Sequence, residues 1–137
     1  MIASYVSDAD YRDDTLSVID EQHLWRMTLG DRRLEREVLQ IFVRQTAILL
    51  ERIAGAEPAL AAAAAHTLKG SACGIGAWRM AHAAERLEVV ARGPDPDGVP
   101  AVELSDAVQE LTAAALEVSA VVGTRLRNPA YVVASEL

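Results

Sequence analysis

The stretch ALAAAAAHTLKGSAC, residues 59–73, contains the pattern that decides the fold class. Alanine is the strongest helix former, so the five alanines that precede His66 predict a helix. Their small side chains also allow a neighbouring helix to approach closely. Aromatic residues make up only 4% of the chain, so the core must be aliphatic. Both features favour closely packed helices over a sheet.

Helical periodicity continues on both sides of this stretch. Apolar residues spaced by three and four predict helices over residues 18–28, 32–54, 58–73, 77–91 and 100–124. Glycine and proline separate these segments, at Gly30, at Gly55, in Gly74-Ile75-Gly76 and in GPDPDG at 93–98. Asp31 follows Gly30 as an expected N-cap. The sequence therefore predicts an all-α protein, an antiparallel up-down four-helix bundle with a short additional N-terminal helix.

The segment 32–54 carries the clearest apolar stripe. The side chains expected to face the core are Leu34, Val38, Ile41 or Phe42, Gln45, Ile48 or Leu49, and Ile53.

Apolar residues make up 51% of the 137-residue chain, which indicates one globular domain with a real core.

Charge and cysteine content exclude several function classes. Thirteen Lys and Arg against twenty Asp and Glu give a net charge of −7, which argues against nucleic acid and against an anionic membrane surface. One cysteine, Cys73, excludes an internal disulfide framework. The sequence shows neither a secretory signal nor an apolar run long enough for a membrane helix. We expect a cytoplasmic protein.

A helical projection of residues 59–73 divides them into two faces. The face expected to meet the core comprises Leu60, Ala61, Ala64, Leu68, Ser71 and Ala72. The opposite, outward face comprises Ala59, Ala62, Ala63, His66, Lys69, Gly70 and Cys73. His66 is thus expected to point away from the core, among small side chains and one lysine.

This outward face suits the binding of an anion such as a phosphoryl group. An exposed imidazole is largely neutral and nucleophilic at neutral pH, and Lys69 lies one turn further on. A mid-helix glycine costs about 1 kcal/mol relative to alanine. Gly70 therefore needs a reason, and clearance for an incoming group is one; a close helix crossing is the alternative.

The motif HTLKGSA at 66–72, followed by Gly76-Ala77 and by Glu85-Arg86-Leu87-Glu88, resembles the signature of histidine-containing phosphotransfer (HPt) domains. The resemblance extends over residues 19–122. It implies a histidine phosphotransfer protein that shuttles a phosphoryl group between receiver-domain aspartates in a two-component phosphorelay. It also implies a phosphoryl carrier without kinase activity of its own, and no nucleotide-binding loop is visible.

The resemblance assigns roles to particular residues. His66 corresponds to the phosphoacceptor, Lys69 to its positive neighbour, Gly70 to the clearance position and Ser71 to a polar support. The projection turns Ser71 toward the core, where its hydroxyl can instead bond to a carbonyl one turn earlier. Glu88 lies where some members carry an amide, and a carboxylate there would repel a phosphoryl group at close range. The expected docking residues are Ala59, Ala62, Ala63, Cys73 and Arg92.

The implied partners are response-regulator receiver domains and a sensor histidine kinase, which can be a hybrid one, with this chain as a monomer. No cofactor of its own is expected, because the receiver supplies Mg²⁺. The expected division is an N-terminal arm over 1–16, the HPt-like bundle over 17–126 and a C-terminal tail over 127–137.

Two other function classes remain open. One is a non-catalytic helical-bundle module that binds a receiver or a kinase without phosphoryl transfer. The other is a metal-dependent bundle enzyme using His82 and Glu85, which is disfavoured because their order is reversed relative to di-iron bundles and no second copy occurs.

Overall fold

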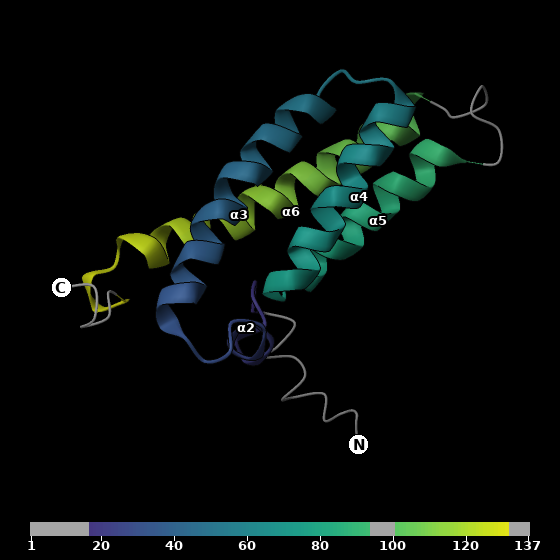
Figure 1. Ribbon diagram of the computed structural model, residues 1–137. Coiled ribbons are helices and arrows are strands. Elements are labelled where there is room, and N and C mark those ends of the chain that lie inside the picture. Colours follow the sequence, from purple (N-terminus) through teal and green to yellow (C-terminus); the bar gives the residue numbers. More distant parts are fainter. Residues whose placement is uncertain (1–16, 94–100, 132–137) are drawn as a thin grey trace.

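The computed structural model describes residues 17–93 and 101–131, and within this part every regular element is helical. The elements are α2 (Glu21–Met27), α3 (Arg32–Ile53), α4 (Pro58–Ile75), α5 (Trp78–Arg92), α6 (Ala101–Arg127) and the 3-10 helix η2 (Pro129–Tyr131). The four long helices α3 to α6 lie side by side, and the short α2 lies at one end of them (Figure 1). The predicted all-α bundle is confirmed.

The helices begin where the sequence places their caps. The Asp31 side chain accepts hydrogen bonds from the backbone N–H groups of Arg33 and Leu34, at 2.9 and 3.2 Å, and so caps α3 as expected. Pro58 stands in the first turn of α4, where its missing N–H costs no helical hydrogen bond.

One predicted connection is wrong. Gly74 and Ile75 belong to α4, and the chain turns only at Gly76, which has a φ of 79°. The N–H groups of Gly76 and Ala77 bond to the carbonyls of Cys73 and Ala72 and close the helix end. The helix therefore stops at the glycine that adopts the left-handed conformation. The expected arm over 1–16 and most of the loop over 93–98 lie outside the described residues.

Helix α3 buries a face adjacent to the predicted one. The buried side chains are Glu35, Leu39, Phe42, Thr46, Leu49 and Ile53, whereas Ile41 and Ile48 are about half exposed and Gln45 is exposed. Of the predicted stripe only Phe42, Leu49 and Ile53 are fully buried, and Leu34 and Val38 are partly buried. Apolar residues occupy two neighbouring faces, and the periodicity alone does not choose between them.

The contacts of Glu35 with distant residues explain why α3 buries this face. The hydroxyl of the buried Tyr131, which follows α6, donates a hydrogen bond to the Glu35 carboxylate. The Arg125 guanidinium lies 3.8 Å from the same carboxylate. A carboxylate can be buried where such partners replace water. Residues far away in the chain thus make the Glu35 face of α3 suitable for burial.

Alanine sets the spacing between α4 and α5, the pair with the most extensive contacts in the bundle. The buried alanines on these helices are Ala61, Ala62, Ala64, Ala65, Ala72, Ala81, Ala83, Ala84 and Ala91. Leu68, Met80 and Leu87 are fully buried among them. The expected close packing of small side chains is confirmed.

No helix of the described residues is long and apolar enough to cross a membrane.

Helix α2 fastens the C-terminal end of α4. His23 bonds through Nε2 to the Cys73 carbonyl at 2.8 Å, and the Trp78 indole donates to the Asp20 carboxylate at 3.0 Å. The Asp20 N–H donates to the Gly76 carbonyl at 2.8 Å. The end of α4 and the start of α5 are therefore held by contacts to residues before and within α2.

We predict that Gly76→Ala lowers the free energy of unfolding by about 1–3 kcal/mol, because alanine is strained in the left-handed conformation. Its Cβ would also lie 2.9 Å from the Asp20 carbonyl oxygen. Gly55→Ala is the matched control, since Gly55 has a φ of 75° and nothing within 4 Å of a Cβ. Chemical denaturation measures both. Equal losses in the two variants would show that the contact with Asp20 does not matter.

Candidate functional site

His66 stands on the outer face of α4 with 62% of its side chain exposed. The orientation that the helical projection predicts is therefore correct. The helix around it is held by packing, because Ala65 and Leu68 on its inward side are fully buried in the core. The imidazole is consequently presented from a fixed helical position rather than from a loop.

The carboxylate of Glu88, on α5, fixes the imidazole. Its Oε2 lies 3.0 Å from His66 Nδ1, and Glu88 is only 8% exposed. An ionised carboxylate can only accept hydrogen bonds, so Nδ1 is the nitrogen that carries the proton. The neutral ring then has its lone pair on Nε2, which has no hydrogen-bond partner among the described residues.

Two cations bind the same carboxylate. Lys69 Nζ lies 3.4 Å from Glu88 Oε1, and Arg92 Nη1 lies 3.0 Å from Oε2. Burial would raise the pKa of Glu88, but the hydrogen bond to His66 and the charges of His66, Lys69 and Arg92 outweigh it and hold this pKa below its usual value. Glu88 is therefore ionised at neutral pH.

A carboxylate at Glu88 was expected to repel a phosphoryl group and so to make no direct contact with it. The structure places the carboxylate against the other nitrogen of the ring, Nδ1. The two cations beside it also compensate its charge. The i,i+4 spacing of Glu88 and Arg92 was the available signal in the sequence, and the proximity of Glu88 to His66 depends on how α4 and α5 pack.

Gly70 lies beside His66 with open space around it. Apart from the backbone of its own helix, a Cβ at this position would have no atom within 4 Å among the described residues, and the same holds for Gly74, one turn further on. Neither glycine has a positive φ. The close helix crossing considered for Gly70 is therefore wrong, because no described helix meets that face, and the clearance interpretation stands as a proposal.

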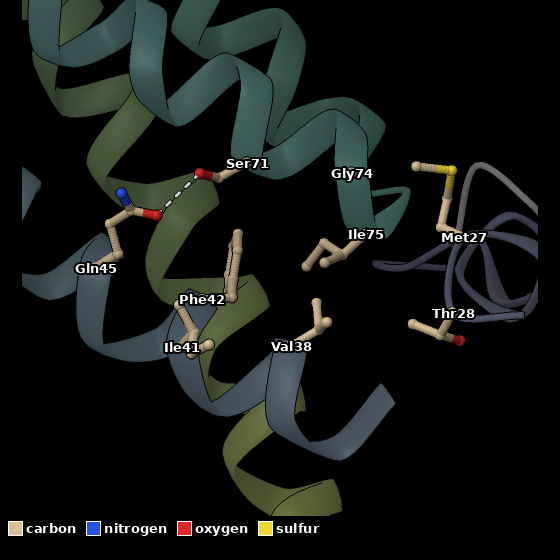
Figure 2. A pocket seen from close by; sticks show the side chains of 9 residues that line it. All are labelled: Met27, Thr28, Val38, Ile41, Phe42, Gln45, Ser71, Gly74 and Ile75. Carbon is tan, nitrogen blue, oxygen red and sulfur yellow. Dashed lines mark hydrogen bonds between the residues drawn. The ribbon is translucent and has the colours of Figure 1, made fainter. Parts of the chain in front are cut away.

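Ser71 faces α3 and neither the core nor a carbonyl of its own helix. Its hydroxyl donates to Gln45 Oε1 at 3.2 Å, and the two side chains point toward each other across the gap between the helices (Figure 2). The placement of Ser71 in the core and its bond to a carbonyl of α4 are thus both wrong, since the inward face of α4 is rotated toward α5, and its role as a polar support stays a prediction.

The same rotation changes the expected docking face. Ala62 is only 1% exposed, because it faces the interior, so the prediction that it lies on this face is wrong. Leu60, expected inside, is 63% exposed. Ala59, Ala63 and Arg92 are exposed, and Cys73 is partly buried.

An apolar groove opens on the α3 side of α4 (Figure 2). Its lining has no charged side chain and consists of Met27, Thr28, Val38, Ile41, Phe42, Gln45, Ser71, Gly74 and Ile75. The outer face of α4 is therefore bordered by ionic groups on the α5 side and by an uncharged groove on the α3 side.

The described residues contain no cluster of three His, Cys, Asp or Glu side chains that could hold a metal ion. His82 and Glu85, the pair considered for a metal, are both exposed on α5. The His66 cluster contains a lysine and an arginine, whose charges oppose the binding of a cation.

Comparison with known protein families gives a match over the central part of the chain. The model of the Hpt domain matches residues 37–117, which is more than half of the chain and includes all of α4 and α5. No curated protein and no solved structure matches the chain. The chain belongs to the Hpt domain family, whose members are histidine phosphocarriers of two-component signalling that interact with receiver domains and kinases.

Proposed function

We propose that this protein carries a phosphoryl group on His66 Nε2 and passes it between receiver-domain aspartates in a phosphorelay. The observation that supports this most strongly is the fixed imidazole. Glu88 holds Nδ1 at 3.0 Å, and Nε2 is left with its lone pair on an exposed ring. A nucleophile oriented in this way needs no base of its own.

The transfer itself requires positioning and charge compensation rather than covalent help from the carrier. The Nε2 lone pair attacks the phosphorus of an aspartyl phosphate, and the P–O bond breaks so that the aspartate carboxylate leaves with the electron pair. Lys69 supplies positive charge one turn from His66. The receiver supplies the aspartate and the Mg²⁺, and this chain needs no cofactor of its own.

A receiver must bring its phosphoaspartate close to Nε2. The small residues Ala59, Ala63, Gly70 and Gly74 leave room along that face of α4, and it continues into the uncharged groove beside α3. We therefore place the docked receiver over α4 and α3, with Ile41 at the contact. Transient interfaces are small, and an uncharged groove beside a helix face of small residues suits one.

We predict that His66→Gln folds like the wild type and accepts no phosphoryl group from a phosphorylated receiver. The side chain is 62% exposed and the glutamine amide can still donate a hydrogen bond to Glu88, so the circular dichroism spectrum and melting curve should be nearly unchanged. Transfer of radiolabelled phosphate measures the loss, and the label on the wild type should be acid-labile and stable to base.

Retention of the label in His66→Gln would refute the assignment of the phosphoacceptor. A wild-type protein that binds receivers and is never labelled would instead indicate the non-catalytic binding module. Profiling against every receiver of the source genome distinguishes these outcomes and names the partners.

We predict that Gly70→Ala stabilises the fold by up to about 1 kcal/mol, since alanine favours the helix and its Cβ would meet no atom within 4 Å. The same Cβ would obstruct a docked receiver, so transfer to and from His66 should slow.

Gly123→Ala on α6 is the matched control, because its Cβ would meet only the far end of the Arg127 side chain. It should share the gain in stability and keep the transfer rate. If Gly70→Ala transfers as fast as Gly123→Ala, the clearance role is wrong.

A further inference from the structure

We propose that Glu88 keeps a proton on Nδ1 of phosphorylated His66 and thereby keeps the phosphoryl group transferable. The inference rests on the proposed phosphocarrier function and concerns what happens after His66 has been loaded. It assigns to Glu88 the control of phosphoryl release, in addition to its hold on the free imidazole.

The proton balance of loading leads to this role. The neutral ring has its proton on Nδ1, facing Glu88 Oε2 at 3.0 Å. Formation of the P–Nε2 bond uses the lone pair of Nε2 and removes no proton. The product is a phosphoimidazolium whose positive ring contacts the carboxylate, so loading turns a hydrogen bond into an ion pair.

Release depends on whether that proton stays. When a second receiver's carboxylate attacks the phosphorus, the P–Nε2 bond breaks and the electron pair returns to Nε2. With Nδ1 protonated, the leaving group is a neutral imidazole. With Nδ1 deprotonated, the leaving group would be an imidazolate anion, which is a far poorer one. The carboxylate that holds the proton therefore favours onward transfer.

Glu88 suits this role because of its burial and its partners. It is 8% exposed, so its interaction with Nδ1 is less weakened by water than that of a surface carboxylate. Lys69 and Arg92 bind it as well and keep it ionised. Glu88 contacts the ring at Nδ1 and therefore does not occupy Nε2, the nitrogen that carries the phosphoryl group.

The charged groups around the pair are few in the described residues. His66 and Lys69 face Glu88 from α4, and Arg92 faces it from α5. Helix α6, which packs against α5, places Glu110 and Glu117 beside Arg86 and Arg79 instead. Within the described residues, Glu88 is therefore the carboxylate that can hold a proton on the phosphorylated ring.

The test uses the full chain loaded at His66 with phosphoramidate, a small-molecule phosphoryl donor. ¹⁵N NMR of the imidazole follows the proton on Nδ1 as the pH is raised from 5 to 9. In wild type the ring should stay protonated through neutral pH. In Glu88→Gln the midpoint should fall by about 1–3 pH units, the effect expected of a lost opposite charge at this distance.

The rate at which the phosphoryl group leaves gives a second readout. At pH values above the Nδ1 midpoints of both proteins, Glu88→Gln should release its phosphoryl group to a receiver more slowly than the wild type. The expected factor is about ten for each pH unit by which its midpoint lies below that of the wild type. At acid pH, where both rings are protonated, the two proteins should differ little. A merely structural role of Glu88 would change the rate at every pH by one factor.

Two control variants separate this effect from others. Glu85→Gln removes a carboxylate from an exposed position one turn earlier on α5 and should leave the pH profile unchanged. Lys69→Ala removes a positive charge one turn from His66 and should slow transfer at all pH values. The wild-type NMR titration needs no variant, so the inference can be tested even if Glu88→Gln fails to fold.

Failure of the inference is distinguishable from failure of the proposed function. If phosphoramidate and phosphorylated receivers leave His66 unlabelled, the phosphocarrier function itself is refuted. If His66 is labelled and Glu88→Gln has the wild-type midpoint and pH profile, the function stands and the role of Glu88 in release is overturned. Loss of the Nδ1 proton from the wild type below neutral pH would also overturn it.

Discussion

The hydrogen bond between Glu88 and His66 is the interaction on which the site depends. It joins α4 to α5 through one carboxylate that also binds Lys69 and Arg92. A buried carboxylate is tolerated only where protein groups replace its hydration, and here three basic side chains do so. The contacts that allow Glu88 to be buried also orient the imidazole of His66. They hold the positive charges of Lys69 and Arg92 at the carboxylate that contacts this ring.

This arrangement requires α4 and α5 to lie close together. The buried alanines between the two helices keep their axes near, so that Glu88 reaches His66 across the interface. Larger side chains there would separate the helices and lengthen the contact. The buried alanines of α4 and α5 therefore favour the contact between His66 and Glu88, because methyl groups let the two helices lie closer than larger side chains would.

The two sides of α4 differ in character. Toward α5 lie the ionic groups, and toward α3 lies the uncharged groove with Ile41 and Gly74 (Figure 2). Phosphoryl transfer needs charge close to the reacting atoms, whereas a contact that must release quickly is better made from apolar surface of modest size. The outer face of α4 joins these two surfaces, with His66 at the ionic edge.

The sequence by itself determined the helices, the position of Asp31 as a cap and the outward direction of His66, because these follow from local propensity and a 3.6-residue period. It also carried the motif from His66 to Ser71, which lies within the residues that the Hpt family model matches. The tertiary structure alone decided which of two apolar faces α3 buries, that Ser71 meets Gln45 and that Ala62 lies inside. Above all it brought Glu88, 22 residues from His66 in the chain, to the ring. Such contacts depend on the rotation of each helix about its axis, which packing against neighbours sets and local sequence does not.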